Sequence, residues 1–310
     1  MSSSKTKKEN NHYIKRRKNV QEMMSKTSNR KIYVNKLVTI LCVCCVILAI
    51  IPLGSILFEV FKNGSSAISF EFLTQKPGSI GSGKGGIGPA IQGTLIVVSS
   101  ASIIAVPVGV FAGIYLSEYA KNNNKFAFAV RFFADVLTGL PSIIVGIVSY
   151  VIIVISIGSF SVIAGAFSLS LIMIPLVTRI TEESLKMVPD SIREAAHSLG
   201  APKWKITIFI VLKTATSGVL TGILLSIARI AGETAPLIMT ILGTSLYFSS
   251  FTGPVDALPL RIWRLASLPY ESAHASGWGA AMILILLILG LNIGLRVLAR
   301  RQNIATSKDT

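Results

Sequence analysis

Two charged residues, Arg229 and Glu233, stand inside a stretch that is apolar on both sides, between Ser217 and Leu242. A charged side chain at the centre of a bilayer costs about 2.5–3.5 kcal/mol on insertion scales, so such residues usually face a bundle interior or a solvated path. Residues four apart on a helix share one face, so we expect the two side chains to pair. A fixed cation in a membrane path indicates an anion as cargo.

The surroundings of this pair predict a break in its helix. Gly232 and Pro236 flank Glu233, and a proline removes a backbone hydrogen bond, as in the broken helices of many transport sites. Arg179 is a weaker candidate for the same pathway, because an arginine near a helix end can extend to the lipid headgroups. The role of Asp135 stays open.

The composition is that of a membrane protein. The chain has 310 residues, of which 51% are hydrophobic and 14% charged, and its mean hydropathy is +0.66. We therefore expect an all-α polytopic membrane protein. The net charge of +16 does not indicate nucleic acid, because residues 1–36 alone carry eleven Lys and Arg. We expect this basic tail to be disordered or to lie on anionic membrane lipid.

Six apolar windows are long enough, at about 20 residues each, to cross a bilayer. They predict spans at residues 37–60, 90–116, 132–156, 159–180, 214–242 and 277–299. Lys and Arg gather in the N-terminal tail, in segments 117–131 and 181–213, and after the last span, which places all of these in the cytoplasm. Both termini are then cytoplasmic, and residues 301–310 form a short tail behind the domain at 37–300.

The cytoplasmic segment 181–213 carries the signals of two helices separated by a hinge. Ser191 and Glu194 fit a capping box at a helix start. Gly200 suits the left-handed residue that ends a helix, and Pro202 can open the next helix, which leads into the fifth span. A short helix rich in small residues at this end suits a groove on a partner protein.

The sequence predicts no metal site, no bound cofactor and no catalytic centre. The three cysteines fall inside the first predicted span and the three histidines are scattered, without metal-ligand spacing. Neither His-Glu-x-x-His nor Gly-x-Ser-x-Gly occurs, which argues against an intramembrane enzyme.

The run Glu194-Ala195-Ala196, followed by Gly200, resembles the EAA loop of bacterial ABC importer permeases. The resemblance implies the six-helix, MetI-like permease fold. It also implies that this loop, with Arg193, forms a coupling helix that sits in a partner ATPase. One departure is Leu212-Lys213, where the family pattern usually continues to Leu-Pro.

Three segments, 85–95, 193–204 and 227–237, resemble more narrowly the phosphate importer permeases of PstA type, and the likeness covers about residues 37–300. This resemblance implies one of two permease subunits in a bacterial plasma membrane. The implied partners are a second homologous permease, an ATPase homodimer that uses ATP-Mg, and an extracytoplasmic phosphate-binding protein. The chain itself would then perform no catalysis.

In such a permease, Arg229 would offer its planar guanidinium group to phosphate in a two-point contact, while Glu233 would balance the charge at rest. The alternative is an ion pair that only holds helices together. Two rival functions also stay open. An ABC permease for molybdate or sulfate would suit the same pair, and a stand-alone ion-coupled carrier would leave the loop around Glu194 unexplained.

Overall fold

The computed structural model describes residues 3–79, 85–120 and 124–306, and these residues are mostly helical. The described part contains no β-strand, only isolated bridges between Pro77 and Gly85 and between Leu242 and Val255. The expectation of an all-α protein is therefore confirmed. The chain divides into two compact units, Met1–Glu59 and Val60–Thr310.

The first unit consists of most of helix α1, which runs over Ser3–Gly64. The apolar part of this helix begins at Lys31 and qualifies as a candidate membrane span. The structure gives helical backbone to the basic tail from Ser3 onward, where the sequence predicts disorder. The reason lies in the residue types, because no Gly or Pro precedes Pro52 and the tail is rich in Lys and Arg, which favour helices.

The second unit contains four more helices that are long and apolar enough to cross a membrane. They are α3 (Gly88–Ile114), α7 (Val162–Lys186), α10 (Leu212–Ala231) and α13 (Glu271–Thr306). A π-helical turn, η2 (Tyr115–Tyr119), extends α3. Short α9 (Lys203–Lys205) and the π-helical η4 (Ile206–Val211) lead without interruption into α10.

The third predicted span is wrong as a single straight helix. The structure has α4 (Lys125–Gly139) and then α5 (Ser142–Ser149), which η3 (Tyr150–Val154) and α6 (Ile155–Ile157) continue. The two halves meet at an angle of 105° and count as a sixth span if taken together. Pro141 causes the break, because a proline disfavours helical backbone in the residue before it, and Leu140 is extended, with ψ 137°.

Other predicted boundaries shift for local reasons. Helix α7 begins at Val162, where the side chain of Ser161 accepts a hydrogen bond from the Ala164 amide at 3.2 Å, and it continues six residues past the predicted end at 180. The fifth span ends at Ala231, not 242. Helix α13 continues to Thr306, so it includes part of the predicted tail 301–310, whose last four residues lie outside the described ones.

Helix α7 is the centre of the second unit. Helices α3, α10 and α4 all pack against it, and its inner face is buried over most of its length. Glycines make the approach close: a Cβ atom at Gly109 would lie 2.7 Å from the Cβ of Val177, and one at Gly113 would lie 2.6 Å from the Cβ of Thr181. Small residues at such contacts are typical of helix pairs in membranes, where van der Waals packing drives association.

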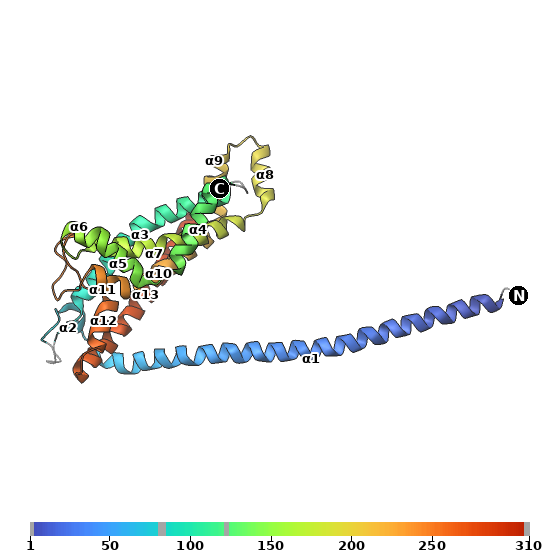
Figure 1. The fold of residues 1–310 in the computed structure, drawn as a ribbon, viewed down its shortest axis with the longest axis horizontal. Coiled ribbons are helices and arrows are strands. Elements are labelled where there is room, and N and C mark those ends of the chain that lie inside the picture. The colour runs from blue at the N-terminus through green and yellow to red at the C-terminus, as the bar shows by residue number, and fades with distance from the viewer. Residues whose placement is uncertain (1–2, 80–84, 121–123, 307–310) are drawn as a thin grey trace. The chain divides into compact units, whose positions relative to one another are not determined.

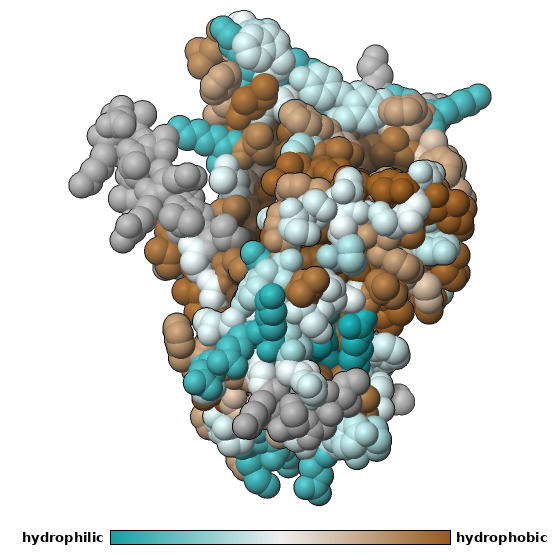
Figure 2. All heavy atoms as spheres, turned by 90° about the vertical axis from the view of Figure 1, so that its left-hand side faces the viewer, coloured by the Kyte–Doolittle hydropathy of each residue, from teal (hydrophilic) through white to brown (hydrophobic). Residues whose placement is uncertain are grey.

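The two ends of the second unit differ in their elements (Figure 1). Helix α8 (Asp190–Ser198) and α9 lie at one end of the bundle, while α2 (Phe70–Thr74), α11 (Ala235–Thr240) and α12 (Leu258–Ala266) lie at the other. Apolar side chains form a broad area on the face in Figure 2, and hydrophilic residues gather mostly below it. Large apolar side chains such as Ile103 and Phe111 on α3 are exposed, which suits contact with lipid or with another membrane helix.

Helix α3 also makes a contact that tolerates no side chain. A Cβ atom at Gly93 would lie 2.0 Å from the backbone carbonyl oxygen of Asp256. We expect Gly93→Ala to lower the free energy of unfolding by about 1–3 kcal/mol through overpacking, measured as a lower thermal midpoint of the purified protein in detergent. The control is Gly290→Ala, where a new Cβ meets nothing within 4 Å. Equal thermal midpoints for the two variants would contradict this packing.

Candidate functional site

Helix α8 forms as a short element between two turns. Pro189 precedes it in extended conformation, and Gly200 follows it with φ +76°, which confirms the predicted left-handed stop. The predicted capping box is wrong, because the helix already begins at Asp190 and Ser191 lies inside it, with no side chain capping the N-terminus. Pro202 lies at the start of the next helix, but it is the extended residue before Lys203 and not the first helical residue that the sequence predicts.

Arg193 attaches α8 to the ends of two membrane helices. Its Nη2 atom donates to Glu118 Oε1 at 2.8 Å and to the Leu185 carbonyl at 2.8 Å. Its Nη1 atom donates to the Val188 carbonyl at 2.5 Å. Glu118 lies on η2 behind α3, and Leu185 lies near the end of α7. One side chain therefore joins α8 to both of these helices.

The contact between Arg193 and Glu118 is largely shielded from solvent. The Arg193 and Glu118 side chains are 18% and 7% exposed. The hydrogen bond with Glu118 raises the pKa of Arg193 above its ordinary value, and burial opposes this rise only in part. The guanidinium group therefore stays charged at every physiological pH.

The remaining loop residues divide between two faces of α8. Ala196 is buried in a cluster that also contains Leu185, Val188 and Ile206. Glu194 and Ala195 are exposed, and Leu199 is 88% exposed although it is apolar. The structure thus separates residues that hold α8 in place from residues that it presents outward, a division that the sequence pattern alone does not contain.

The structure separates Arg229 and Glu233 instead of pairing them. Helix α10 ends at Ala231, Gly232 caps it, and α11 starts only at Ala235, so the predicted break is confirmed. The expectation of a shared helix face is wrong for the same reason, because Glu233 follows the end of α10. Arg229 is exposed and Glu233 is half-buried, and neither forms an ion pair with a described residue.

Arg179 has partners that the sequence did not reveal. Its Nη1 atom lies 3.0 Å from Asp135 Oδ1 on α4, and its Nε atom lies 3.6 Å from Glu183 Oε1 on the next turn of α7. All three side chains are more than half exposed. Arg179 therefore joins α4 to α7 at the surface, and the open role of Asp135 is that of its partner.

A second ion-pair cluster lies one turn further along α7. Glu182 is almost fully buried and contacts Arg131 at 2.8 Å and Lys186 at 2.6 Å. Arg131 also donates to the Leu116 carbonyl at 3.1 Å, so it links α4 to both α7 and η2. The sequence interpretation missed Glu118 and Glu182. Their position in the sequence could have indicated a partner. Each is an acidic residue at the end of an apolar stretch, next to a segment that is rich in Lys and Arg.

At the opposite end of the bundle, Asp256 is fully buried and accepts a hydrogen bond from Arg261 Nε at 2.7 Å. Burial raises the pKa of Asp256, and the charge of Arg261 acts against this rise. The second carboxylate oxygen, Oδ1, has no hydrogen-bond partner among the described residues. In the part of the chain that the structure describes, no group of three or more His, Cys, Asp or Glu side chains could hold a metal ion.

Residues 105–304 match the family described as "Binding-protein-dependent transport system inner membrane component". The chain is 39% identical over 268 residues to the phosphate transport system permease protein PstA of Yersinia pestis, covering 86% of this chain and 90% of that protein. It is 35% identical over 251 residues to the probable phosphate transport system permease protein PstA of Methanocaldococcus jannaschii, covering 81% and 88%.

Two solved structures share the fold. A chain of a bacterial alginate ABC transporter, solved with a periplasmic protein that carries an alginate pentasaccharide, has a TM-score of 0.62 at 15% identity and covers 88% of this chain and 96% of its own length. A chain of the inward-facing MetNI methionine ABC transporter has a TM-score of 0.55 at 17% identity, covering 69% and 93%. At these identities the likeness concerns the fold alone.

The Arg193 contact predicts how firmly α8 is held. Hydrogen bonds to charged groups contribute about 1.5–3 kcal/mol, so removing them by Arg193→Ala should accelerate amide hydrogen exchange in α8 by about ten- to a hundredfold. The matched control is Glu194→Gln, an exposed position on the same helix, which should leave the exchange unchanged. Unchanged protection in Arg193→Ala would show that α8 is held by its apolar contacts instead.

Proposed function

The chain belongs to the family of binding-protein-dependent transport system inner membrane components, within it to the PstA-type permeases, and from this membership we propose how it works. It is a multi-pass membrane protein with the fold of ABC importer permeases, and it is a permease subunit of a phosphate importer. The proposals concern its orientation, its partners and the residues that act in transport.

We propose that the chain lies in a bacterial plasma membrane with both termini and α8 in the cytoplasm. The excess of Lys and Arg in the segments at this end supports that orientation. The end with α2, α11 and α12 then faces the outside, where an extracytoplasmic phosphate-binding protein would deliver its cargo. The two ends lie at opposite extremes of the second unit (Figure 1).

The observation that carries the transport mechanism is the position of Arg229. This arginine follows Lys213 by 16 residues on α10, about 24 Å along the helix, and is exposed without an ion pair to any described residue. An uncompensated cation at such depth needs a partner surface or a solvated path. A second homologous permease would cover this face, and the phosphate path would lie between the two subunits.

Within that path, Arg229 would contact two phosphate oxygens at once through its planar guanidinium group. Glu233, displaced from Arg229 by the break after α10, would repel the anion and so prevent tight binding. The break also provides flexible backbone at this depth, which suits a passage that opens and closes. Arg179 stays a weaker candidate for the pathway, because Asp135 and Glu183 already compensate its charge.

Helix α8 would couple this path to ATP. Its outward face, with Glu194, Ala195 and Leu199, would sit in a groove of an ATPase homodimer, while Arg193 and Ala196 hold its inner face to the permease. Closure of the ATPase around ATP-Mg would push α8, and Arg193 would pass the displacement to α3 and α7. The permease would rock from inward-facing to outward-facing without binding a cofactor or performing catalysis itself.

Two other functions remain as alternatives. Arg229 would suit molybdate or sulfate as well as phosphate, and only the names of the relatives favour phosphate. A stand-alone ion-coupled carrier would not need α8, whose exposed apolar Leu199 calls for a partner.

The full complex in lipid vesicles tests the transport proposal. We expect phosphate-loaded binding protein to stimulate ATP hydrolysis, and Arg229→Ala to reduce phosphate uptake by at least about tenfold, since a charge-assisted contact is worth more than 1.4 kcal/mol. The control, Lys213→Ala, removes an exposed cation from the same helix and should leave uptake near the parent value. Stimulation by sulfate or molybdate but not by phosphate would overturn the substrate, and normal uptake in correctly inserted Arg229→Ala would overturn the pathway.

A second experiment tests the docking of α8. Leu199→Asp places a charge on the exposed apolar position that would enter the ATPase groove, so the ATPase should no longer co-purify with the permease. Phe70→Asp makes the same kind of change at an 81% exposed residue at the other end of the bundle and should retain the ATPase. Loss of the ATPase in both variants, or in neither, would reject α8 as the docking element.

A further inference from the structure

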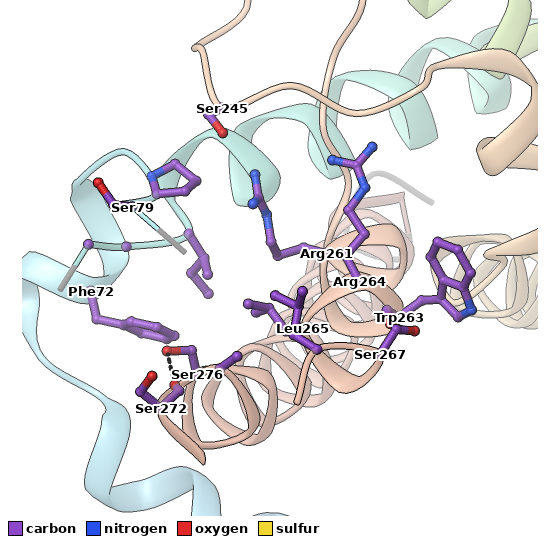
Figure 3. Close-up of a pocket in the computed structure, with 17 residues that line it drawn as sticks. Phe72, Ser79, Ser245, Arg261, Trp263, Arg264, Leu265, Ser267, Ser272 and Ser276 are labelled. Carbon is purple, nitrogen blue, oxygen red and sulfur yellow. Dashed lines mark hydrogen bonds between the residues drawn. The ribbon is translucent and has the colours of Figure 1, made fainter. Parts of the chain in front are cut away.

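A cavity lies at the end of the bundle that the proposed orientation places outside the cell (Figure 3). It occupies ≈ 410 Å³, within the range of about 300–1,000 Å³ that is usual for small-ligand sites. Three groups of described residues line it: Phe72 with residues 77–79 and 85–87 before α3, residues of α12 and of the segments on either side of it, and the start of α13. None of these residues belongs to the path around Arg229.

Two arginines of α12 line this cavity, and their charges are compensated differently. Arg261 forms an ion pair with the buried Asp256. Arg264 contacts only the backbone carbonyls of Leu242 and Gly243, through its Nη2 atom, and it forms no ion pair with a described residue. None of the described lining residues is acidic. The cavity therefore carries one positive charge that no carboxylate balances.

Hydroxyl groups accompany this charge. Ser245 and Ser272 line the cavity from opposite sides (Figure 3), and neither hydroxyl forms a hydrogen bond with a described residue. The Nε and Nη1 atoms of Arg264 are likewise without partners among the described residues. Unused donors around an uncompensated guanidinium group match an anion that accepts several hydrogen bonds, above all a tetrahedral oxyanion.

We propose that this cavity is an outer oxyanion-binding site, with Arg264 as its charged ligand, that receives inorganic phosphate before the anion reaches Arg229. The proposal rests on the function proposed above. The cavity is open to solvent on one side, and Arg264 is only half-buried, so binding is weak and release is fast. Both properties suit a site that takes up an anion delivered next to it and then passes it on.

A reporter thiol tests the site without measuring transport. Cys42, Cys44 and Cys45 are replaced by Ser, and Ser267→Cys is introduced, since the Ser267 hydroxyl lines the cavity but already donates to the Trp263 carbonyl at 2.8 Å. The complex of both permeases and the ATPase is placed in vesicles without binding protein. The rate of alkylation of the new thiol by N-ethylmaleimide is followed by mass spectrometry while chloride is exchanged for phosphate at constant ionic strength.

We expect millimolar phosphate to slow alkylation several-fold in a saturable manner. Arg264→Gln, which keeps a donor for the Leu242 carbonyl, should abolish this protection, and Arg264→Lys should weaken it. The matched control Lys76→Gln removes an exposed cation of the same outer segment that does not line the cavity and should retain full protection. Sulfate should slow alkylation as well, because the proposed site binds a tetrahedral oxyanion and sulfate has the same shape.

Two outcomes would overturn the site: phosphate gives no protection, or protection persists in Arg264→Gln. Uptake measurements keep this test separate from the proposed function. Phosphate uptake without protection rejects the cavity alone, whereas protection without phosphate uptake upholds an oxyanion site and rejects phosphate as the transported cargo.

Discussion

A charge that leaves water must find a partner, and this requirement accounts for most of the polar structure in this permease. Taking an ion out of water costs several kcal/mol even after relaxation, so a buried charge persists only with compensation. Glu118, Glu182 and Asp256 are all nearly or fully buried, and each has an arginine as its partner. The pairs of Glu118 with Arg193 and of Glu182 with Arg131 join segments that are far apart in the chain, so compensation also determines which elements lie together. Asp256 and Arg261 are only five residues apart, and their pair holds the start of α12.

By the same requirement, an arginine without a carboxylate partner is a candidate site for an anion. Arg229 and Arg264 both lack an ion pair among the described residues. Arg229 lies near the end of α10, and Arg264 lines the cavity beside α12. An importer of an anion needs sites that are positive when empty and weak enough to release their cargo. Compensated arginines such as Arg193 differ from these, because Arg193 is largely buried and bound to Glu118 and to the Leu185 carbonyl, and in the proposed function it transmits movement instead of binding cargo.

Helix α7 connects these two kinds of site. Its glycine-mediated contacts bring α3 close, its C-terminal end holds α8 through Arg193, and its surface carries the ion pairs to α4. A displacement of α8 therefore reaches the centre of the bundle through few and stiff contacts. At the far end of α10, the break at Gly232 supplies the flexibility that such a displacement needs.

Much of this organisation was already present in the sequence. Of the six apolar windows, five correspond to long apolar helices and one to the bent pair formed by α4 and α5. Gly200 and Pro202 predicted the hinge behind α8, and Gly232 with Pro236 predicted the break after α10. Local chemistry decides these features, because backbone conformation and hydropathy depend on residues close in the chain. The bend at Pro141 was equally local, and the proline was visible, but the length of the apolar window concealed it.

The contacts between distant segments could not be predicted in this way. That Arg193 faces Glu118 and that Arg179 contacts Asp135 follow from how α3, α4, α7 and α8 pack. An ion pair forms between groups a few ångströms apart in space, and spacing along the chain predicts such proximity only within one unbroken helix. The sequence by itself therefore determined the helices, their breaks and the family. The tertiary structure alone decided which charges have an ion-pair partner among the described residues, because that depends on distances between segments far apart in the chain.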